Sequence, residues 1–210
     1  MFGFRTRRLP RATCAILAGF LGSWPAVAQA HPHVFIKQHV AALFDRSGLT
    51  GFRLTWRFDP MYSSMMRADY VASKDGPLTA ADVKKLHDNC FVDLKDEHYF
   101  TAVTLNGAPL PLGTPTDFSA SSVDGDIVYS FVIPLKPAPG TLRPQNQVEI
   151  TVFDPSYYVY YELAADDPVA ESGGAALGAQ CGSKAVWRDS IGWGRVHSDV
   201  VTCSYRSPSP

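Results

Sequence analysis

Two histidines separated by one proline, His31 and His33, stand where a new chain end is expected. The triplet Ala28-Gln29-Ala30 before them has the A-x-A pattern of a signal-peptide cleavage site, and cleavage there leaves His31 as the first residue. A terminal histidine offers an α-amine with a pKa of about 8 and an imidazole with a pKa of about 6.5, and the two nitrogens can chelate one metal ion. Side chains two residues apart face the same side of an extended strand, which brings in His33. These residues predict a three-nitrogen metal site.

Pro32 restricts the kind of site that this chain end can form. The square-planar copper and nickel sites of amino-terminal X-X-His sequences use the ionised amide nitrogen of the second residue, and proline has no N–H to lose. That mode is excluded, so further ligands have to come from elsewhere in the chain. The candidates are Asp59, Asp154, His39 and His197. Amine, imidazole and carboxylate donors together suit Ni(II), Co(II), Zn(II) or Cu(II).

Asp59 and Asp154 belong to two similar pentapeptides, FDPMY at residues 58–62 and FDPSY at residues 153–157. Each pentapeptide lies at the end of a predicted strand, so the two carboxylates are expected at equivalent strand ends. The alternatives are a turn or helix-cap role for each aspartate and a solvated, frayed terminus for the two histidines. The predicted metal ligands are His31, His33, Asp59 and Asp154.

Other kinds of chemistry have weaker support. The segment Ser73–Leu78 resembles part of a calcium loop, but Asp82 stands where such a loop requires a bidentate glutamate. A nucleophilic hydrolase is not indicated, because the chain has no Gly-x-Ser-x-Gly motif and Cys90 has no identifiable base. We predict no catalytic residue and no enzymatic activity.

The first 30 residues have the layout of a secretory signal peptide. They carry four arginines and no acidic residue, and their apolar run from Ala12 to about Leu21 is too short to span a bilayer. The expected destination is the periplasm. The general secretory route is favoured over the twin-arginine route, because Pro10 stands where a twin-arginine signal has an apolar residue.

The mature chain is mildly acidic. Loss of the four arginines leaves 15 of the 19 Lys and Arg residues against 20 Asp and Glu residues, a formal charge of −5. The absence of a basic block argues against a nucleic-acid partner, and no second apolar segment of membrane length follows the signal peptide. About 180 residues suit one domain, which we place at 31–206 with a disordered tail at 207–210.

Three cysteines remain after cleavage, Cys90, Cys181 and Cys203. An oxidising compartment favours one disulfide among them. Cys90 belongs to an apolar stripe with helical spacing, which turns it toward the interior as a small apolar residue. We therefore predict the disulfide Cys181–Cys203, which closes a loop of about twenty residues and contributes about 3 kcal/mol.

The elements that position the candidate ligands begin with two strands, His33–Asp45 and Leu49–Phe58, which the turn signal between them joins as a hairpin. A two-helix insertion over about 60–98 follows. Its first helix, Met61–Tyr70, has Asp59 as a natural N-cap. Its second helix opens at Thr79-Ala80-Ala81-Asp82, a weak variant of the capping box, and is expected to run to about Glu97.

The rest of the chain is expected to form short strands separated by turns. They cover Phe100–Leu105, Asp117–Ser122, Ile127–Pro134, Gln147–Phe153, Tyr157–Leu163, Lys184–Trp187 and Val200–Tyr205. The segment Gly173–Gly178 is expected to be flexible. The predicted fold class is α+β and β-rich, an antiparallel β-sandwich-like domain with the helices inserted after the first hairpin.

Five segments carry a family resemblance: HPHVFI, TWRFDPMYSSMM, YFTAVTLNG, TDFSASSVDGDIVYSFVIP and VFDPSYYVYYEL. Together they resemble the domain of unknown function 1007 family, which is labelled as a periplasmic component of an uncharacterised ABC-type transport system. The resemblance covers nearly all of the mature chain. It places the family's His-Pro-His on His31, Pro32 and His33 and its Phe-Asp motifs on Asp59 and Asp154. Many members have a carboxylate at position 37, where this chain has Lys37.

The resemblance implies a metal-handling accessory role, because members tend to be encoded near nickel, cobalt or zinc transport proteins. We expect a periplasmic protein that captures a divalent transition metal at its mature terminus and passes it to an inner-membrane transporter. The alternatives are a small copper carrier, an oxidase built on a histidine brace, and a metal-free module that docks a transporter.

Overall fold

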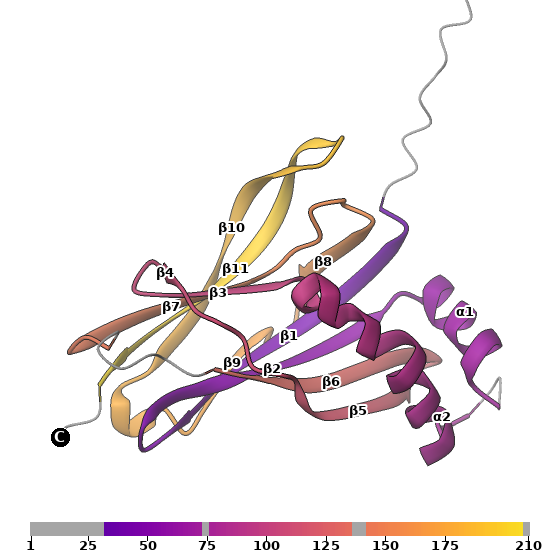
Figure 1. Cartoon of the computed structure of the whole chain (residues 1–210), viewed down its shortest axis with the longest axis horizontal. Coiled ribbons are helices and arrows are strands. Elements are labelled where there is room, and N and C mark those ends of the chain that lie inside the picture. The colour runs from indigo at the N-terminus through magenta and orange to yellow at the C-terminus, as the bar shows by residue number, and fades with distance from the viewer. Residues whose placement is uncertain (1–31, 73–75, 136–141, 208–210) are drawn as a thin grey trace, which may run out of the picture. The chain divides into compact units, whose positions relative to one another are not determined.

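The computed structural model describes residues 32–72, 76–135 and 142–207, all within the unit His31–Pro210, one of the two units into which the chain divides (Figure 1). The predicted signal peptide, His31, and most of the predicted tail lie outside the described residues. So do Ser73 to Asp75, which begin the calcium-loop-like segment.

The predicted first hairpin is confirmed. Strand β1 (Val34–Asp45) pairs antiparallel with β2 (Gly48–Phe58), and Lys37 lies opposite Arg57. Burial alternates along β1, so one face of the hairpin packs inward and the other is exposed. In the turn, the Asp45 carboxylate accepts hydrogen bonds from the backbone N–H and the hydroxyl of Ser47.

The hairpin belongs to the first of two sheets, sheet A. Its strand order is β5-β6-β2-β1-β8, and β9 also pairs with β1. The added strands are β5 (Thr116–Val123), β6 (Asp126–Pro134), β8 (Val159–Leu163) and β9 (Val169–Ser172). The expectation of a purely antiparallel arrangement is wrong, because β8 and β9 both run parallel to β1. β8 starts beside the start of β1, so the two strands run in the same direction.

Sheet B has the order β10-β11-β7-β3-β4. Its strands are β3 (Thr101–Leu105), β4 (Ala108–Pro109), β7 (Gln145–Val152), β10 (Gln180–Ser190) and β11 (Gly194–Arg206). Cys181 and Cys203 lie directly opposite each other on β10 and β11 and form the predicted disulfide. The segment expected to be flexible instead contains a short 3₁₀ turn, η3 (Ala175–Leu177), which leads into β10.

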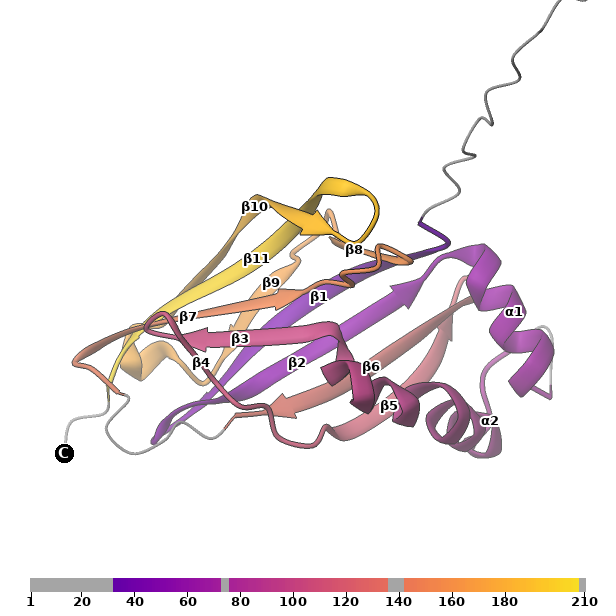
Figure 2. The ribbon, with the colours of Figure 1, turned by 45° about the horizontal axis from the view of Figure 1, so that its top comes forward.

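The helical insertion follows β2, as predicted. Helix α1 (Pro60–Tyr70) starts at its N-cap Asp59, and α2 (Ala80–Leu86) starts at a complete capping box formed by Thr79 and Asp82. Figure 2 shows α1 and α2 beside strands β6 and β5 of sheet A.

The expectation of one regular helix to about Glu97 is wrong. The α-helical turns end at Leu86, and the chain continues as a π-type segment, η1 (His87–Phe91), and a 3₁₀-type segment, η2 (Val92–Phe100). Three consecutive residues, His98, Tyr99 and Phe100, have φ angles of 50°, 53° and 50°. These left-handed conformations turn the chain sharply into β3, which a regular α-helix cannot do.

The two sheets and the insertion share one hydrophobic core. Trp56 and Phe131 of sheet A meet ring to ring, and Phe91 of the insertion packs on Phe131. Ile150 of β7 and Tyr205 of β11 contribute from sheet B. Cys90 is half-buried against this core, as the apolar stripe predicts, and burial raises the pKa of its thiol. Within the described residues, no helix has the length and apolar character that crossing a bilayer requires.

Asp82 makes the stability of the insertion dependent on pH. Its buried carboxylate accepts hydrogen bonds from the backbone N–H of Ala72 and from the N–H and hydroxyl of Thr79, and these bonds hold its pKa at about 2, below the ordinary 3.8. A carboxyl with a depressed folded-state pKa stabilises the fold above its unfolded pKa and loses that contribution as the pH falls to its folded pKa. We expect the stability to fall between about pH 4 and about pH 2 for this reason.

Urea denaturation across that window is the measurement for Asp82. Asp82→Asn should be less stable at neutral pH and should show a smaller loss between about pH 4 and about pH 2. An acid-induced loss as large in Asp82→Asn as in the wild type would mean that other carboxyls account for it.

Candidate functional site

The start of β1 is held from both sides. On the β8 side, the carbonyl of Tyr158 accepts the backbone N–H of His33 at 2.9 Å and that of Val34 at 3.2 Å. On the β2 side, the backbone N–H of Asp59 donates to the carbonyl of Phe35 at 2.9 Å. The ring of His33 also packs on the ring of Tyr158, with centroids 4.9 Å apart. His33 is therefore anchored, although only the single residue Pro32 precedes it in the described chain.

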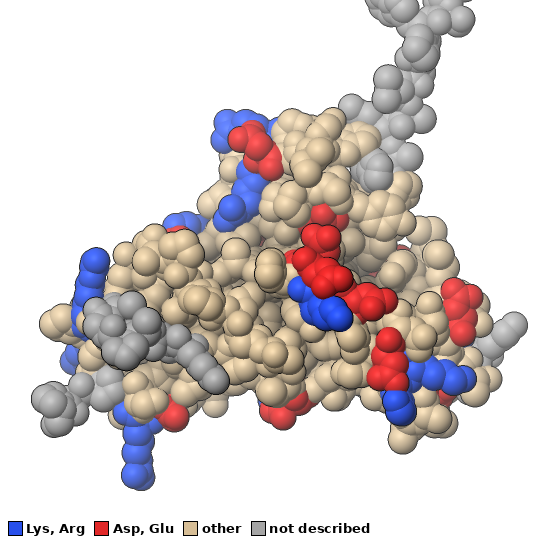
Figure 3. Space-filling view, viewed as in Figure 1, with Lys and Arg blue, Asp and Glu red and all other residues tan. Residues whose placement is uncertain are grey.

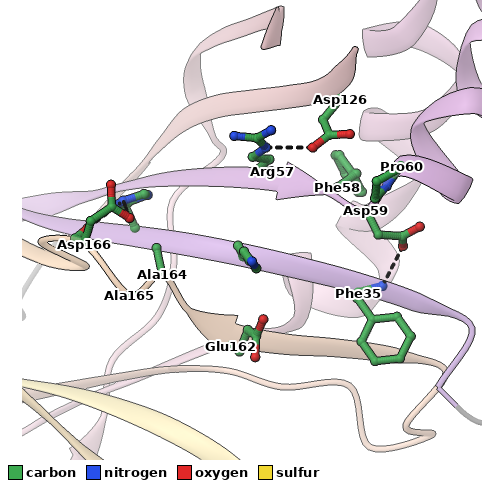
Figure 4. Close-up of a pocket in the computed structure, with 12 residues that line it drawn as sticks. Phe35, Arg57, Phe58, Asp59, Pro60, Asp126, Glu162, Ala164, Ala165 and Asp166 are labelled. Atoms are coloured by element: carbon green, nitrogen blue, oxygen red, sulfur yellow. Dashed lines mark hydrogen bonds and ion pairs between the residues drawn. The ribbon is translucent and has the colours of Figure 1, made fainter. Parts of the chain in front are cut away.

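Asp59 joins this strand start to the helical insertion. Its Oδ2 accepts the backbone N–H of Phe35 at 2.9 Å, the bond drawn in Figure 4, and its Oδ1 accepts the N–H of Tyr62 at 2.9 Å as the N-cap of α1. The predicted cap role is confirmed. An ionised carboxylate has about four acceptor positions, so these two bonds leave Asp59 able to bind a cation.

Asp154 has a different environment. Its side chain is 4% exposed. Its Oδ1 accepts the N–H and the hydroxyl of Ser156, and its Oδ2 accepts the N–H of Val159 at 2.9 Å. Val159 is the strand partner of Val34 at the start of β1. Asp154 therefore organises the turn that brings β8 beside β1, which is the turn role considered as the alternative to metal ligation.

The two Phe-Asp-Pro motifs thus flank the same strand start, in keeping with the expectation of equivalent strand ends. The first follows β2 and places Asp59 in direct contact with β1, whereas the second follows β7 and places Asp154 at the beginning of β8. The similarity between the motifs does not extend to exposure, because Asp59 lines an open groove and Asp154 is buried.

The other candidate histidines lie apart from His33. His39 is six residues further along β1, about 20 Å away at the rise of an extended strand, and its Nε2 lies 3.1 Å from the carbonyl of Asp166. His197 is on β11 of sheet B, where its ring packs on exposed Trp187. Across residues 32–72, 76–135 and 142–207, no three His, Cys, Asp or Glu side chains gather in a way that could hold a metal ion.

A groove of about 470 Å³ runs along the outer face of sheet A from Phe35 and Asp59 to His39 and Asp166 (Figure 4). Charged side chains from three neighbouring strands line it: Arg57 on β2, Lys37 on β1 and Glu162 on β8. The guanidinium of Arg57 donates to Asp126 at 2.7 Å, and this bond raises the pKa of Arg57. The groove can hold a small polar molecule.

Sequence reasoning missed this groove, because its charged row depends on strand register and the parallel pairing of β8 was not foreseen. The face of the molecule seen in Figure 3 is largely uncharged, with acidic and basic side chains in small mixed groups. No extended basic surface is visible on that face.

Comparison with known proteins identifies the family. A family model described as "Protein of unknown function (DUF1007)" matches residues 16–187. The chain belongs to this family. The DUF1007 match includes the predicted ligand positions His31, His33, Asp59 and Asp154, and it ends before the disulfide partner Cys203.

A more distant similarity connects this DUF1007 chain to one curated protein. It is 26% identical over 105 residues to the "Uncharacterized 15.5 kDa protein in trpE 3'region" of Spirochaeta aurantia, a match that covers 50% of this chain and 73% of that protein. Neither description states an activity or a ligand.

Proposed function

We propose that this DUF1007 protein is a periplasmic accessory protein that binds one divalent transition ion at its mature amino terminus. The ion is nickel, cobalt, zinc or copper, and the protein supports its transport across the inner membrane by delivering it to a transporter. The domain that presents the site is assigned as β-sandwich-like, with sheets A and B facing each other across the shared core.

The donor set consists of the α-amine and imidazole of His31, the imidazole of His33 and the carboxylate of Asp59. Asp154 is left out of this set because its carboxylate is buried and already accepts three hydrogen bonds. A mixed nitrogen and oxygen donor set suits all four ions.

The observation that carries the proposal is the anchoring of the strand start. His33 is held by Tyr158 through a backbone bond and a ring contact, and the carboxylate of Asp59 bonds to the backbone two residues further on. A ligand fixed by its own neighbours loses less conformational freedom when the ion binds, which increases affinity. Because the remaining ligands belong to a chain end, the site can open to release the ion, and this suits delivery better than storage.

Calorimetric titration of the cleaved protein, residues 31–210, with Ni(II), Zn(II) and Cu(II) tests the proposal. Loss of a group that hydrogen-bonds to a metal ligand typically lowers metal affinity by about 10- to 100-fold, so we expect His33→Ala, which removes a ligand, to weaken binding by at least about 100-fold. Asp59→Asn should weaken it by about tenfold or more, provided that circular dichroism shows the fold intact.

His197→Ala is the matched control for this titration, because His197 is an exposed histidine on the other sheet. Its affinity should equal that of the wild type. If His33→Ala also binds as tightly as the wild type, the terminal site is wrong.

A further inference from the structure

A second, smaller cavity lies beneath the helical insertion. It has a volume of about 80 Å³ and lies between the inner face of sheet A and helix α1. Its wall is mainly apolar and aromatic and includes Ile36, Met66, Phe100 and Tyr161. Tyr158, which is 48% exposed, lines its open side.

Two buried polar groups line this cavity without a nitrogen or oxygen partner among the described residues. They are Nε1 of Trp56, a residue 0% exposed, and the hydroxyl of Tyr129, a residue 1% exposed, which has only the thiol of Cys90, a weak hydrogen-bond group, beside it. Trp56 and Tyr129 are directly opposite each other on β2 and β6. Gln38, the partner of Trp56 on β1, also has an unpaired buried Oε1, but it does not line the cavity. Buried polar atoms are almost always paired in folded proteins, so the two that line the cavity point to a binding role.

The groups that line the cavity indicate what kind of molecule it can bind. An indole N–H is only a donor, and burial raises the pKa of Tyr129, so its hydroxyl remains protonated and can also donate. A buried water usually makes about three hydrogen bonds, and the cavity has room for several waters but few unpaired polar atoms for them. A charged molecule is excluded by the cost of burying its charge in an apolar wall.

We infer that this cavity binds an uncharged organic molecule, or the uncharged end of a longer one, whose carbonyl oxygen accepts hydrogen bonds from Trp56 and Tyr129. The volume limits the buried part to less than a benzene ring, because a cavity that takes benzene measures about 150 Å³. A group of three or four non-hydrogen atoms matches this size.

Nuclear magnetic resonance titration of the cleaved, metal-free, ¹⁵N-labelled protein tests the inference. The probe is acetone, and its isostere isobutene lacks the oxygen. The indole N–H resonance of Trp56, assigned with Trp56→Phe, should shift saturably with acetone. Loss of both hydrogen bonds predicts about 100-fold weaker binding of the hydrocarbon. Because metal is absent, the outcome does not depend on the proposed metal function.

Two tyrosine variants test whether the ketone binds in this cavity. Tyr129→Phe removes one donor of the cavity and should weaken acetone binding about tenfold. Tyr205→Phe removes another buried, unpartnered hydroxyl that does not line the cavity, and it should leave binding unchanged. The inference is overturned if Trp56 shows no saturable shift, if ketone and hydrocarbon bind equally, or if Tyr129→Phe binds the ketone as well as the wild type.

Discussion

Asp154→Ala is expected to lower the free energy of unfolding by about 3 kcal/mol. The substitution removes the carboxylate that accepts the N–H groups of Ser156 and Val159, and a hydrogen bond to a charged group contributes about 1.5–3 kcal/mol. Urea denaturation at neutral pH measures the effect as a lower midpoint at an unchanged slope. Because Val159 pairs with the start of β1, the His33 backbone amide should also exchange faster with solvent.

Ser156→Ala is the control for Asp154. It removes the hydroxyl that donates to Asp154 but keeps both backbone N–H bonds to the carboxylate, so a loss of about 1 kcal/mol is expected. A loss below about 1 kcal/mol for Asp154→Ala would contradict the structural role that we assign to this carboxylate. Asp154 would then again be a candidate metal ligand.

Local sequence signals predicted much of the fold. The alternating pattern on both sides of the Asp45 turn predicted the first hairpin, and Asp59 before Pro60 predicted the start of α1, because caps and turns depend on neighbouring residues alone. The disulfide was also predictable, because the helical stripe assigned Cys90 to the core and left Cys181 and Cys203 to pair.

Features that depend on distant residues were not predictable in this way. The parallel pairing of β8 and β9 with β1 depends on where the chain returns after β7, which no local pattern encodes. The left-handed residues His98 to Phe100 have no glycine signal and depend on packing around them.

The candidate site likewise has features that the sequence predicts and features that depend on strand pairing. His33 and Asp59 were predicted as ligands from residue type and spacing, and the structure anchors both at the start of β1. The roles of Tyr158 in holding His33 and of Asp154 in holding β8 emerge only from strand pairing. The row formed by Trp56 and Tyr129 depends on the register between β2 and β6, so no local pattern indicates the inner cavity.

The second large effect concerns the free amine of His31. A protein that carries one extra residue before His31 keeps both imidazoles, but its former α-amine becomes an amide, which cannot bind the ion as a neutral amine. Loss of one arm of the chelate should weaken metal binding by about 100-fold. An amine that titrates near about 8 must lose its proton before it binds, so the affinity of the cleaved protein should also rise between about pH 6 and about pH 8.

The most direct measurement is a Ni(II) titration of the cleaved and the extended protein side by side at about pH 6, 7 and 8. We predict about 100-fold tighter binding by the cleaved protein at about pH 8, and a gap that narrows toward about pH 6 as the amine becomes protonated. Equal affinities at all three pH values would contradict a metal site built on the mature amino terminus.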